Sequence, residues 1–349
     1  MSNLITLAGL IDPHVHLRDP GQTQKEDFTT GTSAALAGGF TTVLDMPNNA
    51  DPVFTIERLK AKIEIAKEKT VCDIGFYFGS QGDNLDQFAE AAEYAVGLKL
   101  YLNVTTGNFL MDPSYLKKIY AAWPAHLPVL LHAEEDVIDI AVESLKGLNR
   151  PVHICHMPSR EILQKIISAK QAGLPVTCGV TPHHLFLNDK DAKRLGVYGQ
   201  MKPSLKPQTD VDFLWEHLDD IDLFESDHAP HTHAEKQEGA FGVPGLETTL
   251  PLLLTAERDG KISREQIIDK CHTQALKIFG LKNDKTTKVE VSMEEYELSN
   301  NGLQTKCAWT PFTSRKVIGK VQTVYLRGNK VYENGKVLAK LGSGKVISN

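Results

Sequence analysis

The chain has 349 residues, of which 41% are hydrophobic and 23% charged, and this composition excludes a disordered protein. Its 38 lysines and arginines stand against 44 acidic residues, and the net charge of −6 argues against nucleic acid or an anionic membrane surface as the main partner. No run of about 18 apolar residues occurs, so no membrane span is expected. Five scattered cysteines and an N-terminus without a secretory signal favour a reduced, cytoplasmic compartment.

Short apolar runs, each followed by an amphipathic stretch, recur along the first two thirds of the chain. The runs cover residues 10–16, 41–48, 73–79, 97–103, 128–134, 151–157, 175–184 and 221–231. They are continuous rather than alternating, which is typical of strands buried on both faces. Between them we expect helices such as 55–69 and 159–171, with Thr55 and Ser159 as N-caps, and the second helix ends near Gly173.

Eight strands that alternate with helices predict a parallel sheet, and eight is the number that closes into a (β/α)8 barrel of about 250 residues. An open doubly wound sheet is the competing fold. We disfavour it because the first strand is followed by HLRDPG instead of the Gly-rich turn of that fold. The sequence therefore predicts a TIM-type α/β barrel.

The pattern of alternating strands and helices ends in the last part of the chain. A helix is expected over 263–280, where Ser263 and Gln266 form a capping-box pattern. Residues 319–338 predict two strands around a turn that contains asparagine. We therefore divide the chain into a barrel, residues 8–285, and a C-terminal extension, residues 286–349, whose small β segment packs with the N-terminus.

Polar side chains collect at the ends of the predicted strands, where a barrel carries its chemistry. The chain has 13 histidines, an unusual number, and several of them lie at these ends. The strand ends hold His14, His16, Asn48, Lys99, His132, His156, His184 and Asp227. So many metal-ligand types after apolar strands predict a metal site.

Two pairs of histidines are predicted to bind two different ions. His14 and His16 are two residues apart on a strand, so both point to the same side and one ion can take both. His132 and His156 end the fifth and sixth strands and together suit a second ion.

Strand alternation also separates the residues around His156. It puts Ile154 and His156 on one side of the strand, and His153 and Cys155 on the other. We therefore interpret His153 and Cys155 as structural.

Three further residues are predicted to take part in the chemistry. Lys99 lies among leucines, and it either snorkels to solvent or is buried, where a cation is expensive and the neutral amine can add CO₂. The resulting carbamate has two oxygens that can bridge two divalent cations. Asp227 can be a metal ligand and exchange a proton with water. His231 can be cationic or a hydrogen-bond donor, which suits a carboxylate substrate.

Several motifs occur together and in order along the chain. They are HVHLRDPG (14–21), MPN (46–48), GLKLYLN (97–103), HAE (132–134), HICH (153–156), PHHL (182–185), SDHAPH (226–231), PGLET (244–248) and TPF (310–312). This set resembles the amidohydrolase superfamily and, more closely, the dihydroorotases. The closest similarity is to the dihydroorotase domain of the multifunctional animal pyrimidine-synthesis protein, and it covers almost the whole chain.

The resemblance implies a centre of two Zn²⁺ ions. In it, His14, His16 and Asp227 bind one ion, and His132 and His156 bind the other. Carboxylated Lys99 and a hydroxide bridge the two ions. The resemblance further implies a substrate site, whose residues are Arg18 and Asn48 for the carboxylate, together with Thr105, Lys202, His231 and Gly242.

The sequence departs from the animal pattern in three places. A glutamate that helps to bind a third zinc there aligns with Gly179, so we do not expect a third zinc, although Cys155 and His184 are retained. An arginine aligns with Lys202, which keeps the charge but loses the fork geometry of a guanidinium. The loop 104–108 has Thr105–Thr106 instead of Thr-Phe and so lacks an aromatic cover.

The implied reaction is the reversible cyclisation of N-carbamoyl-L-aspartate to L-dihydroorotate in pyrimidine biosynthesis, with Asp227 as general acid and base. Another cyclic amidohydrolase, such as a hydantoinase, dihydropyrimidinase or allantoinase, is a second hypothesis that the carboxylate-binding Arg18 and Asn48 disfavour. A non-catalytic scaffold domain is a third. The resemblance implies a homodimer or higher homo-oligomer, free-standing or within a pyrimidine-synthesis multienzyme.

Overall fold

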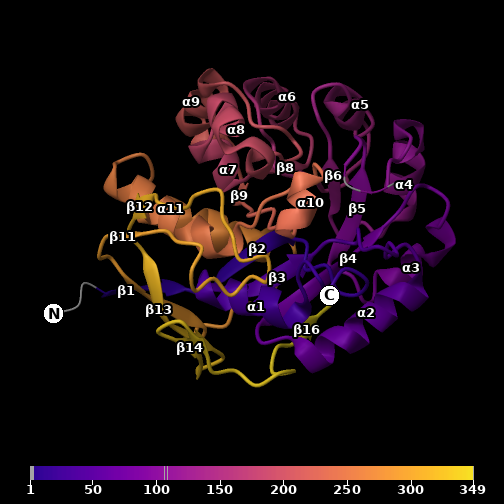
Figure 1. Cartoon of the computed structure of the whole chain (residues 1–349). Helices are drawn as coiled ribbons and strands as arrows, with labels where there is room; N and C mark the ends of the chain where they lie inside the picture. The colour runs from indigo at the N-terminus through magenta and orange to yellow at the C-terminus, as the bar shows by residue number, and fades with distance from the viewer. Residues whose placement is uncertain (1–3, 106, 108, 349) are drawn as a thin grey trace.

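The centre of the molecule is a barrel of eight parallel strands, seen in the computed structural model, which describes residues 4–105, 107 and 109–348 (Figure 1). All eight predicted strands are confirmed. They are β2 (Leu10–Val15), β3 (Phe40–Asp45), β4 (Asp73–Gly79), β5 (Gly97–Tyr101), β6 (Val129–His132), β7 (Val152–Ile154), β8 (Val176–Val180) and β9 (Leu223–Phe224). Each strand pairs with the next in chain order, so all the carboxyl ends lie at one end of the barrel.

The barrel closes where its last strand meets its first. Val15 forms a parallel bridge with His228, and the His16 backbone N–H donates to His228 O at 2.8 Å. Asp12 reinforces this closure, because its carboxylate accepts from the backbone N–H of His14 at 3.1 Å and of Ser226 at 3.2 Å. The closing contact thus lies at the carboxyl end, beside the residues predicted to bind metal.

The barrel strands are accompanied by helices, most of which cover the outside of the barrel (Figure 1). They are α1 (Phe28–Ala37), α2 (Ile56–Lys69), α3 (Phe88–Ala91), α4 (Leu116–Ala122), α5 (Ile138–Glu143), α6 (Arg160–Gln171), α7 (Pro182–Phe186), α8 (Asp189–Leu195), α9 (Gln208–Glu216), α10 (His233–Gln237), α11 (Leu246–Arg258), α12 (Arg264–Ile268) and α13 (Gln274–Ile278). The predicted caps Thr55 and Ser159 are confirmed, since each side chain accepts a backbone N–H of the first turn. Gly173 has a φ of +78° and follows α6, as expected for the residue after a helix.

The predicted helix over 263–280 is interrupted. Ser263 and Gln266 form the expected capping box at its start. A π-helical segment, Asp269–Thr273, then separates α12 from α13. Within this segment the His272 ring bonds to Gly9 O at 2.8 Å, which ties the segment to the start of β2.

A second, antiparallel sheet lies beside the barrel and joins the two ends of the chain (Figure 1). Its strands, in order, are β1 (Leu4–Ala8), β10 (Lys288–Ser292), β13 (Lys320–Leu326), β14 (Asn329–Glu333) and β15 (Lys336–Val337). A short pair, β11 (Tyr296–Glu297) and β12 (Lys316–Val317), forms separately. The division at 285/286 stays a prediction.

Residues 319–338 form three strands joined by two turns, one strand and one turn more than predicted. Arg327 and Gly328 form the turn between β13 and β14, so that turn contains no asparagine. The asparagine belongs to the next turn, Asn334–Gly335, between β14 and β15. All four residues have positive φ, which two-residue hairpin turns of this hand require.

The C-terminal strand β16 (Val346–Ile347) returns to the barrel and pairs with the first half of β4 (Figure 1). The stagger of the barrel explains this pairing. β5 pairs only with Tyr77–Gly79, in the second half of β4, and Val346 and Ile347 pair with Ile74 and Gly75. β16 therefore satisfies backbone groups that β5 does not reach.

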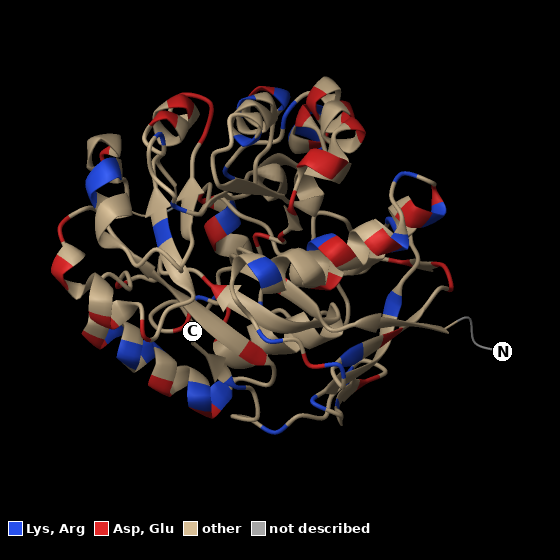
Figure 2. Cartoon of the chain, turned by 180° about the vertical axis from the view of Figure 1, so that it is seen from behind, with Lys and Arg blue, Asp and Glu red and all other residues tan. Residues whose placement is uncertain are grey.

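Acidic and basic residues are interspersed over the outer helices, as Figure 2 shows from behind. In the described part of the chain, we find no helix with the length and apolar character that crossing a membrane demands.

A buried ion pair beneath the end of β3 supports the loop that follows β2. Lys62 Nζ lies 2.7 Å from Asp45 Oδ2 and also donates to Asn49 Oδ1 at 2.7 Å and Met46 O at 2.9 Å. Asp45 Oδ1 accepts the backbone N–H of Leu17 at 2.7 Å. The pair therefore connects helix α2 with the loops that follow β2 and β3.

We predict that Asp45→Ala lowers the free energy of unfolding by about 3–5 kcal/mol, because it leaves the Lys62 ammonium buried without a counter-charge. Urea unfolding followed by circular dichroism measures the change. The double variant Asp45→Leu/Lys62→Met removes both charges and should recover most of the loss. Equal destabilisation in the single and double variants would contradict the role of the charge.

Candidate active site

His14, His16 and Asp227 converge at the closure of the barrel. His16 Nε2 lies 3.1 Å and His14 Nε2 3.5 Å from Asp227 Oδ1. Ligand atoms of the three residues all lie within 4.8 Å of one another, and all three residues are buried. The structure thus brings together the residues expected to bind the first ion.

The outer nitrogens of these two imidazoles are already occupied by oxygen acceptors. His14 Nδ1 lies 3.1 Å from Glu225 Oε2, and His16 Nδ1 lies 2.6 Å from Asn48 Oδ1. These acceptors place the proton of each ring on Nδ1 and leave a lone pair on Nε2. Two lone pairs then face the Asp227 carboxylate, an arrangement that a cation between them stabilises. The donor set fits a divalent metal.

The second predicted pair also comes together. His132 Nδ1 lies 3.0 Å from His156 Nε2, and the pairing of β5 with β6 sets Tyr101 beside His132. His132 Nε2 lies 3.2 Å from Glu134 Oε1, which places the proton there and leaves Nδ1 as an acceptor. His156 Nδ1 is buried and has no protein partner. Glu134 is an orienting residue that the motif HAE contained but our prediction did not use.

Lys99 is fully buried, so it does not snorkel to solvent. Its Nζ donates to Cys155 Sγ at 3.1 Å and lies 5.1 Å from the centre of the Tyr101 ring. Cys155, which we interpreted as structural, thus contacts a predicted ligand, and that interpretation stays a prediction. Cys155 belongs to the apolar interior of the barrel, and Ile154 belongs to the layer between strands and helices.

Backbone conformation explains why alternation misplaced these side chains. β7 ends at Ile154, and His156 has a φ of +36°. This conformation turns His156 inward although Cys155, one residue earlier, already points inward. Arg18 and Asp227 also have positive φ, at +62° and +44°. Such residues each store on the order of 1–3 kcal/mol of strain, and such strain gathers at functional sites.

Burial controls the protonation of the site. Burial, reinforced by the Lys99 cation, lowers the pKa of His14 to about 4. Burial also lowers the pKa of His132 and holds the pKa of His156 well below its usual range. The same desolvation raises the pKa of the Asp227 carboxyl. The imidazoles are therefore neutral, as metal ligands must be, and Asp227 has a strengthened affinity for a proton.

A small cavity opens above the histidines at the carboxyl ends of the strands. Five predicted substrate residues line it, and they are Arg18, Asn48, Thr105, Lys202 and Gly242. Phe241 also lines the cavity, and the Lys202 ammonium lies 5.3 Å from the centre of its ring. Gly242 has a φ of +128°, and a Cβ there would lie 2.6 Å from Ala229 O. Thr106 and Asn108 of the predicted loop lie outside the described residues.

His231 lies behind Arg18 and not on the cavity wall. Its Nε2 lies 3.3 Å from Arg18 Nη2, and its Nδ1 lies 3.4 Å from Lys25 Nζ. Burial, followed by the charges of Arg18, Lys25 and Lys236, lowers the pKa of His231 to about 2. The lowered pKa favours the hydrogen-bonding role expected of His231 over the cationic one, and the neutral ring contacts the Arg18 guanidinium.

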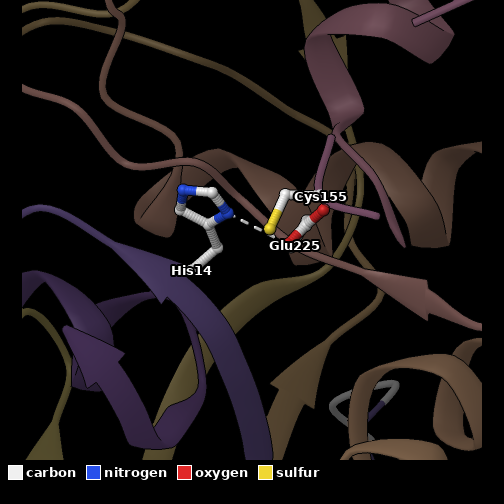
Figure 3. A group of neighbouring side chains, drawn as sticks. All are labelled: His14, Cys155 and Glu225. Carbon is white, nitrogen blue, oxygen red and sulfur yellow. Dashed lines mark hydrogen bonds and ion pairs between the residues drawn. The ribbon is translucent and has the colours of Figure 1, made fainter. Parts of the chain in front are cut away.

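Glu225 is the main site residue that the sequence analysis missed. It directly follows β9 and is 1% exposed. Figure 3 shows its carboxylate beside the ring of His14 and close to Cys155. Burial alone would raise the pKa of Glu225, but the hydrogen bond with His14 and the nearby His153 ring hold it well below its usual range. In the sequence, Glu225 could have been noticed only as a charged residue directly after the apolar residues Leu223 and Phe224.

His184 and His153 bond to other groups of the protein. His184 Nδ1 lies 2.7 Å from Thr181 Oγ1, and its Nε2 lies 3.1 Å from Pro203 O. His153 Nδ1 lies 2.9 Å from Thr177 Oγ1. Both rings of these strand-end histidines are thus oriented by the protein itself.

A parallel eight-stranded barrel with histidines and a carboxylate converging at the strand ends has the architecture of a metal-dependent hydrolase. Comparison with known proteins agrees. The sequence model of the Amidohydrolase family matches residues 5–287. The multifunctional protein CAD of Squalus acanthias is 44% identical over 99% of this chain, which spans 16% of that relative. A dihydroorotase of Pyrococcus abyssi is 35% identical over 98% of this chain and 87% of its own length.

Solved structures show the same fold. An L-hydantoinase from Arthrobacter aurescens superposes with a TM-score of 0.92 at 23% identity, over 99% of this chain and 89% of its own. The inactive dihydroorotase-like domain of a CAD-like protein from Chaetomium thermophilum has a TM-score of 0.85 at 26% identity, over 99% of both chains. The chain belongs to the amidohydrolase family, within its dihydroorotase group. The family implies a divalent metal, which the donor set described above fits.

We predict that divalent cations stabilise the chain through His14, His16 and Asp227. At a free cation concentration a hundredfold above Kd, binding to the folded state adds about 2.7 kcal/mol to the free energy of unfolding. Thermal unfolding of chelator-treated protein with and without Zn²⁺ measures this gain. His16→Ala should lose most of it, and an equal gain in that variant would contradict the assignment.

Proposed function

We propose that the chain is a dihydroorotase that interconverts N-carbamoyl-L-aspartate and L-dihydroorotate. The observation that carries the proposal is the cavity itself, in which Arg18 faces the same space as His14, His16 and Asp227. The metal ligands suit the hydrolysis of an amide. A guanidinium in the same small cavity suits a substrate that carries a carboxylate.

The proposed cofactor is a pair of Zn²⁺ ions. His14, His16 and Asp227 would hold one, and His132 and His156 the other, with Lys99 as an N6-carboxylysine between them. Support comes from the burial of Lys99 and from the contact of its Nζ with Cys155 Sγ, one residue before His156. When bound, divalent cations lower the pKa of water and polarise the substrate carbonyl.

Asp227 is the proposed general acid and base. In the hydrolytic direction its carboxylate accepts a proton from the attacking water and returns it to the ring amide nitrogen as the C–N bond breaks. In the cyclisation, protonated Asp227 gives its proton to a carboxylate oxygen of the substrate. It then takes a proton from the attacking ureido nitrogen and passes it to the same oxygen, which departs as water as the C–N bond forms. The raised pKa of this carboxyl favours both roles.

The carboxylate of the substrate is proposed to bind Arg18. Arg18 Nε is buried and has no protein partner, so the guanidinium keeps donors for a ligand. Neutral His231 orients Arg18 from behind. Asn48, Thr105, Lys202 and the backbone at Gly242 complete the cavity wall.

We also propose that the chain acts in pyrimidine biosynthesis as a homodimer or higher homo-oligomer, in the cytoplasm. Its similarity to multifunctional relatives supports a place in a multienzyme. The five cysteines are buried and unpaired, which suits a reducing compartment.

A hydantoinase-like cyclic amidohydrolase is the second candidate, and likeness to the L-hydantoinase shows only the fold. A non-catalytic scaffold is the third, since a structurally similar domain is described as inactive. The filled set of metal-ligand positions favours catalysis over the scaffold. Arg18 in the cavity favours dihydroorotate over substrates without a carboxylate.

We predict that the zinc-loaded protein turns over dihydroorotate and carbamoyl aspartate, and that Asp227→Ala abolishes turnover by removing the proton carrier while the barrel stays folded. Absorbance assays with and without a chelator, beside circular dichroism of the variant, measure both effects. Faster turnover of hydantoin or allantoin would favour the second candidate. Zinc-loaded protein without any turnover would favour the scaffold.

We predict that Arg18→Lys raises KM for dihydroorotate about 10- to 100-fold, since one bidentate charge-assisted contact is replaced by a single point contact. Initial rates over a range of substrate concentrations measure the change. Lys206→Arg is a matched control at a lysine that pairs with Glu135 away from the cavity. An unchanged KM in Arg18→Lys would exclude Arg18 as the carboxylate ligand.

A further inference from the structure

The buried carboxylate of Glu225 contacts both predicted metal-binding groups, through the His14 ring and the His156 backbone. Its Oε2 lies 3.1 Å from His14 Nδ1, and its Oε1 accepts the backbone N–H of His156. His153 Nε2 lies 3.8 Å from Oε2. Figure 3 shows the contact with His14, which comes from the first barrel strand, whereas Glu225 follows the last. One side chain therefore contacts a predicted ligand of each ion.

The neighbouring strand leaves room for this carboxylate because residue 179 is glycine. Gly179 pairs with Leu223, and Glu225 N–H donates to Val180 O at 3.1 Å, so the two strands run side by side here. A Cβ built on Gly179 would overlap Glu225 Oε1 far inside van der Waals contact. Gly179 has an ordinary backbone conformation, so space and not φ requires glycine. Glu225 and Gly179 are therefore complementary. The space between the two strands holds one carboxylate side chain, which could come from position 225 or from position 179.

The position of this carboxylate determines which nitrogen of His14 can bind metal. A carboxylate that accepts from Nδ1–H leaves the lone pair on Nε2, which lies 3.5 Å from Asp227 Oδ1. An outer carboxylate of this kind orients the ring and increases its basicity as a ligand. The bond to the His156 backbone restrains the residue whose positive φ brings its ring into the site.

We propose that Glu225 is a positioning residue that holds His14 and the His156 backbone in the metal-binding arrangement, and that it depends on glycine at position 179. This inference rests on the proposed metal-dependent function. A cation held between Glu225, Cys155 and the outer nitrogen of His14 is a different arrangement, because the three residues offer ligand atoms within 4.8 Å of one another. The experiments below separate the two.

The first experiment compares the cation affinity of the wild type with that of Glu225→Gln. In the wild type each carboxylate oxygen accepts from a different donor, and in glutamine an NH₂ group, which cannot accept, takes the place of one of these oxygens. We expect the apparent Kd for Zn²⁺ to rise about 10- to 100-fold, measured by competition with a chromophoric chelator over a range of pH. Asp222→Asn is the matched control, because the Asp222 carboxylate also accepts a backbone N–H, that of Cys178, but contacts none of the predicted ligands. Its Kd should stay unchanged, and an unchanged Kd in folded Glu225→Gln would overturn the proposal.

The second experiment moves the carboxylate to the neighbouring strand. Glu225→Gly alone should weaken Zn²⁺ binding, and Gly179→Glu alone should destabilise the fold by crowding Glu225. The double variant Gly179→Glu/Glu225→Gly should recover part of the lost affinity, which a purely structural role of Glu225 would not produce. These variants also test the proposal if Glu225→Gln does not fold. A double variant that binds Zn²⁺ no more tightly than Glu225→Gly would overturn the proposal.

Substitution with Co²⁺ distinguishes the His14–Glu225 hydrogen bond from a cation bound between His14, Cys155 and Glu225. Co²⁺ bound beside Cys155 would give a thiolate-to-metal absorption band, and such a band in the wild type would overturn the proposed hydrogen bond. We expect none. Because cation affinity is measured without substrate, a chain that binds Zn²⁺ through Glu225-dependent ligands but does not turn over dihydroorotate would refute the proposed function alone.

Discussion

The closure of the barrel between β9 and β2 is the constraint on which the rest of the site depends. The His16–His228 backbone bond and the Asp12 carboxylate hold the two strand ends together. His228 in turn lies 3.3 Å from Glu26 and accepts from the Gly245 backbone at 3.2 Å. Asp227 lies between these anchors, so its left-handed backbone is held from both sides and its carboxylate faces the two histidines of β2. Without this closure the first-ion ligands, more than 200 residues apart in sequence, would have no reason to meet.

Four functional side chains are each oriented by a polar partner. Asn48 and Glu225 fix the rings of His16 and His14, Glu134 fixes His132, and His231 supports Arg18. Desolvation makes this arrangement effective, because it keeps the imidazoles neutral and strengthens the proton affinity of Asp227. The ion pair of Lys62 and Asp45 supports the loops from the outside of the barrel. The side chains that line the small cavity are thus held in place by a larger number of polar contacts around it.

Much of the fold was readable from local patterns. Continuous apolar runs predicted all eight strands, and capping residues predicted the starts of α2 and α6. The predicted helix over 263–280 contains a π-helical segment instead, and the first hairpin turn uses Arg327–Gly328. Both differences depend on packing and hydrogen bonds with distant segments, which residue-by-residue propensity does not contain. The pairing of β16 with β4 depends in the same way on the stagger of the barrel.

The sequence by itself determined the barrel and the presence of histidines, Lys99 and Asp227 at its strand ends, because strand periodicity and chain direction carry that information. Only the tertiary structure decided which side chains of the segment after β7 point inward, since the positive φ of His156 breaks the alternation on which the prediction relied. It also decided that burial lowers the pKa of His231 and that Glu225 fills the space beside Gly179. These properties arise from desolvation and from contacts between strands far apart in sequence, and no local pattern encodes either.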